Sequence, residues 1–168
     1  LDEVVGVNQR QVRQSQAAAE AVFVGHGITA PEFGWDDFKD ADVRGKVLVM
    51  FTNEPPSTDS AFFGGRALTY YGRWTYKYEE ALRRGALGAL IIHTTPTAGY
   101  GWNVVRNSWG GEQPFVRLSP GQPALEFAGW LSQQAGAGLV AGTGRTLEQL
   151  LAAAGSRDFR PIQIGRAH

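Results

Sequence analysis

Short apolar runs, separated by glycine, proline and charged residues, recur along the 168-residue chain. The runs Val47–Phe51 and Ala89–His93 are continuous and bounded by turn residues, which predicts two buried strands. A third run, Ala21–Ile28, predicts another strand. Weaker runs predict further short strands at residues 4–7, 115–118, 138–141 and 159–164.

Residues 70–84 have the residue spacing of an amphipathic helix. Apolar side chains recur at intervals of three and four and so share one face, namely Tyr71, Trp74, Tyr78, Ala81 and Leu82. Glu79 with Arg83, and Glu80 with Arg84, are i,i+4 pairs, and Gly85 supplies a left-handed stop. Because this helix lies between the two buried strands, residues 46–93 predict a βαβ unit with parallel strands.

Two more helices are predicted in the C-terminal third of the chain. Residues 124–135 carry apolar residues at helical spacing and are followed by a glycine. Residues 147–154 follow a capping box made by Thr146 and Gln149, which predicts a helix start at that point. Residues 94–114, which lie between the strands and these helices, are predicted to form a long loop.

Composition indicates the class of protein. A hydrophobic share of 43% and a charged share of 19% indicate one globular domain. Sixteen basic residues balance sixteen acidic ones, so the chain lacks the broad positive field that nucleic acid or an anionic membrane attracts. No apolar run approaches the ~20 residues of a membrane span. The absence of cysteine excludes disulfides and a cysteine nucleophile. We therefore expect no nucleic-acid partner and no membrane partner.

Residues 25–30, GHGITA, follow the spacing G-x-G-x-x-A of loops that bind dinucleotide phosphates. Such a loop must open a helix whose first amides face the phosphates. Here Pro31 follows at once and Gly34 comes three residues later, so no lasting helix can start there. The glycines are instead expected to permit a tight bend or close packing of strands.

Four aspartates lie close together in the sequence, at positions 36, 37, 40 and 42. The segment from Asp40 imitates the start of a calcium-binding loop. However, Arg44 stands at its fifth position and Phe51 at its twelfth, where that loop needs oxygen ligands. We therefore expect a solvated acidic loop at this point.

Other candidates for chemistry are equally incomplete. His26, His93 and His168 lack the spacing of a zinc site, and we expect His26 and His93 to be ordinary surface or edge residues. Ser108 lacks the flanking pattern G-x-S-x-G of a nucleophile elbow. The sequence therefore predicts no catalytic residue and no metal ligand in this chain.

Aromatic residues are the strongest candidates for a contact surface. Tyr100, Trp102 and Trp109 lie in the predicted loop, where they either cap a core or face a ligand. Tyr70 and Tyr76 fall off the apolar face of the predicted helix, so both are expected to be exposed. We take these five residues as candidates for contact with a substrate or a partner.

Several stretches resemble a known family. The segment VRGKVLV, the helix after it and the segment GALGALII resemble the core of the protease-associated (PA) domain. The longer strings FVGHGITAPEFGWDDF, FGGRALTYYGRWTYKYEEA and NSWGGEQ are similar to the PA domain of secreted bacterial zinc aminopeptidases, the di-zinc peptidase family M twenty-eight. The resemblance covers roughly residues 20–165.

The resemblance implies an α/β fold with a β-rich, partly barrel-like body of the swivelling β/β/α type and about three flanking helices. It implies a non-catalytic domain beside a catalytic domain that holds the zinc ions, so this chain itself would need no cofactor. The implied role is to cover the neighbouring active site, to steer peptides toward it, or to mediate protein contacts. Its partners would be that catalytic domain and peptide substrates. The implied location is secreted or periplasmic.

The expected organisation is a PA domain at residues 20–165, a tail at 166–168 and an arm or linker at 1–20. Within that arm, residues 8–20 are compatible with an extended segment, a linker or a short helix. The chain starts without Met or a leader, as expected for a piece of a longer protein. Two alternatives stay open: a freestanding peptide- or glycan-binding module that uses the loop aromatics, and a structural spacer.

Overall fold

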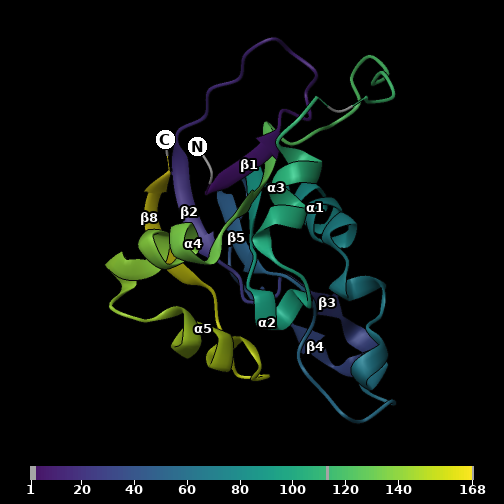
Figure 1. Cartoon of the computed structure of the whole chain (residues 1–168), viewed down its shortest axis with the longest axis vertical. Helices are drawn as coiled ribbons and strands as arrows, with labels where there is room; N and C mark the ends of the chain where they lie inside the picture. Colours follow the sequence, from purple (N-terminus) through teal and green to yellow (C-terminus); the bar gives the residue numbers. More distant parts are fainter. Residues whose placement is uncertain (1–2, 113, 168) are drawn as a thin grey trace.

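The computed structural model describes residues 3–112 and 114–167, and its main feature is an open six-stranded sheet (Figure 1). The strands lie in the order β1-β7-β6-β5-β2-β8. They comprise β1 (Val4–Val7), β2 (Ala19–Phe23), β5 (Val47–Phe51), β6 (Gly88–Ile92), β7 (Phe127–Leu131) and β8 (Ile162–Ala167). The four central strands are parallel, and the edge strands β1 and β8 are antiparallel to their neighbours.

Five α-helices and a small hairpin complete the described part of the chain. The helices are α1 (Trp74–Arg83), α2 (Thr95–Ala98), α3 (Trp102–Trp109), α4 (Gln133–Val140) and α5 (Leu147–Ala154). The hairpin pairs β3 (Thr29–Ala30) with β4 (Trp35–Asp36) across the 3₁₀ turn Pro31–Phe33. Further 3₁₀ turns are Gly65–Ala67, Tyr70–Gly72 and Ala141–Thr143.

The sheet is covered by helices on both faces, as the alternation of side chains along β5 shows. All five residues of β5 are buried. Leu48 and Met50 pack in one core with residues of α1 and α3, while Val49 and Phe51 pack in a second core with residues of α4 and α5. The result is a mixed α/β fold of three layers. Its open sheet differs from the partly barrel-like body that the resemblance implies, and it has five helices instead of about three.

The predicted βαβ unit is confirmed, because β5 and β6 pair in parallel on either side of α1 in the sequence. The strand Val4–Val7 is confirmed as well. So is the helix at 147–154 with its capping box: Gln149 N donates to Thr146 Oγ1 at 3.2 Å, and Thr146 N donates to Gln149 Oε1 at 3.0 Å. Each of these elements depends on a continuous local pattern.

The helix predicted at 70–84 begins later than expected. Residues 70–72 form a separate 3₁₀ turn, and Arg73 is extended, with φ −78° and ψ 143°, so α1 starts at Trp74. The pair Glu80–Arg84 is confirmed, with Nε to Oε1 at 2.7 Å. Arg83 also pairs with Glu80, whereas Glu79 accepts a hydrogen bond from Tyr70 Oη at 3.0 Å.

The helix predicted at 124–135 was wrong. Residues 127–131 form β7, and α4 starts only after Ser132, whose Oγ accepts from Ala135 N at 3.1 Å. Gly129 lies opposite Gly6 of β1, and a Cβ on Gly129 would come within 2.9 Å of the carbonyl oxygen of Val5. The glycine therefore permits the close approach of two strands inside a stretch that has helical spacing.

Other boundaries also differ from the predictions. The predicted loop at 94–114 contains α2 and α3, residues 115–118 have no regular structure, and residues 138–141 are helical instead of extended. Within the predicted arm, β1 belongs to the sheet and residues 8–18 form no helix or strand. β8 extends to position 167, inside the predicted tail, while His168 lies outside the described residues.

The strand predicted at 21–28 spans Ala19–Phe23, because the chain turns after it. Gly25 and Gly27 have φ of +60° and +65°, values that glycine adopts without steric cost. This turn, and the proline turn at 31–33 after it, confirm a tight bend where a dinucleotide loop would need a helix.

Candidate functional site

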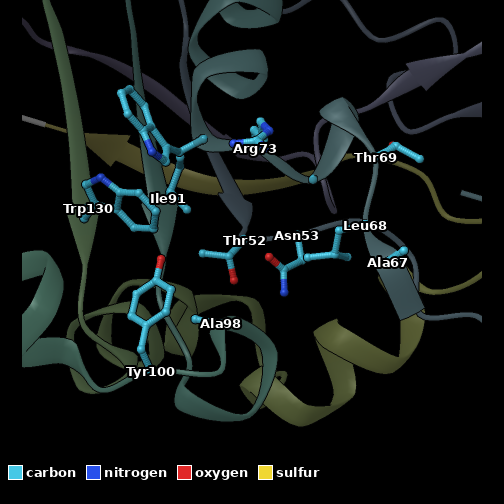
Figure 2. Close-up of a pocket in the computed structure, with 12 residues that line it drawn as sticks. Thr52, Asn53, Ala67, Leu68, Thr69, Arg73, Ile91, Ala98, Tyr100 and Trp130 are labelled. Atoms are coloured by element: carbon cyan, nitrogen blue, oxygen red, sulfur yellow. The ribbon is translucent and has the colours of Figure 1, made fainter. Parts of the chain in front are cut away.

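A groove lies where the parallel strands β5 and β6 end. Its first cavity has a volume of about 370 Å³ and is bounded by residues from five separate segments of the chain. These lining residues are Thr52, Asn53, Ala67, Leu68, Thr69, Gly72, Arg73, Trp74, Ile91, Ala98, Tyr100 and Trp130 (Figure 2). Crevices at the carboxyl ends of parallel strands are a frequent place for ligands in α/β folds.

A second cavity, of about 380 Å³, continues the first. It shares Thr52, Asn53 and Leu68 with the first cavity and adds residues of the His26 turn, the proline-rich segment after β5 and α2. We call the two cavities together the strand-end groove. The three shared residues show that the two cavities adjoin each other.

Exposed apolar and aromatic side chains border the groove. Leu68, Trp74 and Tyr100 are 47%, 45% and 39% exposed, and all three line the first cavity. In Figure 2 the hydroxyl of Tyr100 points toward Ile91 and Trp130, into the space that the lining residues surround. The groove thus combines apolar walls with a few polar groups, as small-molecule and peptide sites do.

Hydrogen bonds hold the walls of the groove in place. Glu54 is buried, and its carboxylate accepts from Thr69 N at 2.8 Å and from Thr69 Oγ1 at 2.6 Å. On the other side, Thr52 Oγ1 lies 2.9 Å from Thr97 Oγ1, and the side-chain amide of Asn53 donates to the carbonyl of Thr97. The loop at 64–72 and helix α2 are therefore both tied to the end of β5.

Two residues with strained backbone line both cavities. Leu68 has φ +44° and ψ 136°, and Asn53 has φ +62°. Asparagine tolerates the left-handed region, but a leucine at positive φ is rare. Such conformations cost about 1–3 kcal/mol each and gather at functional sites, where the surrounding structure holds them.

A buried lysine lies beneath the groove. Lys77 on α1 is 1% exposed, and its Nζ donates to the carbonyl oxygens of His26 and Asn53 at 2.5 Å each. It thereby joins the turn after β2 to the end of β5. Burial lowers the pKa of Lys77, and the nearby carboxylates of Asp37 and Glu54 oppose that shift.

Asp37 corrects the expectation of a solvated acidic loop. Asp40 and Asp42 are exposed, but Asp37 is 1% exposed, and its Oδ2 accepts from Ile28 N at 3.0 Å. Burial raises the pKa of Asp37, and the hydrogen bond from Ile28 opposes that shift. This aspartate fixes the turn that begins the hairpin.

The two histidines are also buried, although the sequence predicted surface or edge positions. His26 and His93 are each 1% exposed. Burial and the nearby Lys77 charge lower the pKa of His26 to about 3, and burial lowers the pKa of His93. His26 Nδ1 lies 3.3 Å from the carbonyl oxygen of Thr52, so this nitrogen carries the proton in the neutral ring.

Of the five predicted contact residues, only Tyr100 lines the groove. Trp102 and Trp109 pack against the core, and Trp109 lies edge-on to Trp74 at 5.3 Å between ring centroids. Tyr70 is 50% exposed, as predicted, but lines neither cavity.

Tyr76 was predicted to be exposed and is 4% exposed. Its hydroxyl accepts from Thr29 N at 3.1 Å and donates to Thr29 O at 3.2 Å. The late start of α1 does not itself move Tyr76, but the hairpin packs on that side of the helix and covers it. Its contacts therefore serve the fold.

The sequence did not identify most of the groove. Trp74 was assigned to the inner face of a helix, and Trp130 lay within a helix that is a strand. No sequence pattern singled out Arg73, Leu68 or Asn53. Aromatic residues crowd either side of Gly72, but the sequence assigned most of them to the inner face of a helix.

No group of His, Asp and Glu side chains that could hold a metal ion occurs within residues 3–112 and 114–167. Over the same residues, no helix is both long and apolar enough to cross a bilayer. No model of a known protein family matches the chain, and no curated protein is similar to it.

Proposed function

We propose that this chain is a non-catalytic PA domain of a di-zinc aminopeptidase. In this role it covers the neighbouring active site or steers peptides toward it, and the strand-end groove is the surface that receives them. Zinc would belong to the catalytic domain of the parent protein, and a secreted or periplasmic location would follow from the same resemblance.

The observation that carries the proposal is that the three sequence segments on which the resemblance depends pack against one another in the structure. Ile28 and Trp35 of the first string share a core with Phe63 and Tyr76 of the second. Trp109 of the third string packs on Trp74 of the second. Strings far apart in sequence thus build one connected region, as expected if they belong to a single ancestral unit.

The form of the groove supports peptides as its occupants. Its two cavities, of about 370 and 380 Å³, adjoin each other at the end of a parallel sheet. Trp74 and Tyr100 offer flat apolar surfaces at its border. Aromatic residues of this kind carry much of the binding energy at protein interfaces.

The same two aromatic residues favour a second candidate, a freestanding peptide- or glycan-binding module, because stacking on exposed rings suits both ligands. A third candidate, a structural spacer, needs no ligand. Deletion of residues 20–165 from the parent enzyme would distinguish a spacer from a domain that steers peptides. A spacer leaves the preference among peptides unchanged, whereas a steering domain alters kcat/KM for long peptides more than for aminoacyl anilides.

A test on the purified chain addresses the proposal directly. We expect no turnover of an aminoacyl anilide, no stoichiometric zinc by metal analysis, and saturable quenching of tryptophan fluorescence by peptides. Trp74→Ala and Tyr100→Ala should weaken peptide binding, each by about tenfold. Tyr70→Ala is the matched control, because Tyr70 is exposed but lines neither cavity.

Circular dichroism would verify that each variant is folded. Turnover that follows the protein through successive purification steps would overturn the non-catalytic role. Binding of oligosaccharides without any binding of peptides would favour the freestanding glycan module. Equal binding by all four proteins would remove the groove from the proposal.

A further inference from the structure

We propose that Arg66 and Arg73 make the strand-end groove selective for peptides that carry negative charge. The inference rests on the proposed function, because it names the class of peptide that the groove admits. It depends on which charged side chains border the groove, on whether they are already paired, and on the apolar residues of the lining.

Two unpaired cations border the groove. Arg73 lines the first cavity and Arg66 the second, and both side chains are exposed. Neither guanidinium forms a hydrogen bond or an ion pair with another residue in the described part of the chain. Their donors are therefore free to meet a carboxylate, which arginine binds in a bidentate manner.

The groove provides little negative charge to offset these cations. Among the described residues, the lining of the two cavities includes one carboxylate, that of Glu54. Both of its oxygens already accept hydrogen bonds from Thr69, and the side chain is 4% exposed, near the buried Lys77. The field that a ligand meets in the groove is therefore positive.

Helix α1 adds to this field. It begins at Trp74 on the wall of the first cavity, and its N-cap residue Arg73 provides no side-chain acceptor for the first amides. The positive end of the helix dipole is thus left uncompensated by the chain at that point. Helix end and guanidinium act in the same direction on a bound anion.

Leu68 lines both cavities, whereas Arg73 lines only the first and Arg66 only the second. Trp74 and Tyr100 border the first cavity. The occupant that matches this order is an extended peptide with an apolar side chain flanked by acidic ones. A neutral peptide would leave the guanidinium groups without partners, and a neutral glycan would do the same.

Isothermal titration with two matched peptides tests the inference. The first is an amidated Gly-Asp-Leu-Phe-Glu-Gly, and the second replaces its two acids by Asn and Gln. At low salt we expect the acidic peptide to bind about tenfold more tightly, and we expect most of that preference to disappear at 0.5 M salt, where charges are screened within a few ångströms.

Variants assign the effect to the two arginines. Arg66→Gln and Arg73→Gln should each weaken binding of the acidic peptide by about three- to fivefold and leave the neutral peptide unaffected. Arg160→Gln is the control, because Arg160 is an exposed arginine that lines neither cavity. It should change neither affinity.

The outcomes separate this inference from the proposed function. If both peptides bind equally, or if the arginine variants keep the preference for the acidic one, the inference is overturned and the peptide-binding role stands. If neither peptide binds, both are overturned. A preference that persists at 0.5 M salt would also contradict an electrostatic origin.

Discussion

Replacing Lys77 by methionine should be among the most damaging single changes in this chain. Methionine keeps an unbranched side chain of similar length, so the change removes the ammonium group and little volume. The carbonyl oxygens of His26 and Asn53 then lose the donor that lies 2.5 Å from each. Asp37 and Glu54 lose the positive charge that lies near them.

The size of the loss follows from these contacts. Each buried carbonyl left without a donor costs about 1–3 kcal/mol, which gives an upper range near 6 kcal/mol. Methionine offsets part of this cost because no ammonium group must be taken out of water. We expect a net loss of about 3 kcal/mol, a large share of the roughly 5–15 kcal/mol that stabilises a domain.

Urea unfolding followed by tryptophan fluorescence measures this loss. With a slope of about 2 kcal/mol per molar, the midpoint should fall by about 1.5 M. Lys46→Met is the matched control: Lys46 Nζ lies 3.1 Å from Glu20 Oε2, and the side chains are 26% and 59% exposed, so the change should cost less than about 1 kcal/mol. If both variants lose the same small amount, Lys77 does not hold the two segments together.

Three further predictions concern pH and backbone. Because burial lowers the native pKa of Lys77 to about 7, the unfolded chain binds more protons than the folded chain above that pH, so the free energy of unfolding should rise from pH 7.5 to 9 in the wild type. It should not rise in Lys77→Met, where Asp37, whose pKa is raised by burial, also loses the charge that opposes that shift. Gly138→Ala should stabilise α4 by up to about 1 kcal/mol, because a Cβ at this position would meet no other atom. Gly136→Ala should destabilise the fold by about 1–3 kcal/mol, because the new Cβ would lie 2.7 Å from Ile92 Cγ2. Equal effects of the two substitutions in thermal melts would contradict this steric account. Leu68 is exposed but has a positive φ, which a β-branched residue adopts least easily and glycine most easily. Leu68→Val should therefore lower the free energy of unfolding by more than about 1 kcal/mol, and Leu68→Gly should lower it by less. The reverse order in urea unfolding would exclude backbone strain at this position.

The parts of the fold that the sequence predicted correctly are those with local causes. The run Val47–Phe51 is apolar at every position because both faces of β5 are covered, and that burial is visible as a continuous pattern. The capping box of Thr146 and Gln149 lies within four residues. In both cases the information that decides the structure is contained in the segment itself.

The errors have causes outside the segment concerned. β7 is a strand because β1 and β6 pair with it, and its helical spacing cannot reveal those neighbours. The start of α1 depends on Arg73, which is extended beside a loop that Glu54 holds through Thr69. Residues 102–109 form a helix but were predicted to be a loop, because the glycines on either side and the two tryptophans do not make a helical pattern that can be recognised in the sequence.

The candidate site was the least predictable feature. Its lining comes from the end of β5, the loop at 64–72, the start of α1 and the segment around Tyr100, together with Ile91 and Trp130 from the sheet. The parallel register brings these together, and no linear pattern carries that register. Tyr100, which the sequence singled out, does line the groove, whereas the charge and the backbone strain at the groove are visible only in three dimensions.

The pairing of β2 with β8 has a consequence for how the chain is made. Residues 19–23 pair with residues 162–167, so this edge of the sheet is completed only after the ribosome has synthesised the later segment. Until then, β2 displays unpaired amides and carbonyls to any extended segment nearby. A ribosome that stalls before position 162, or a protease that removes residues 162–167, should therefore release a product that aggregates through this unpaired edge.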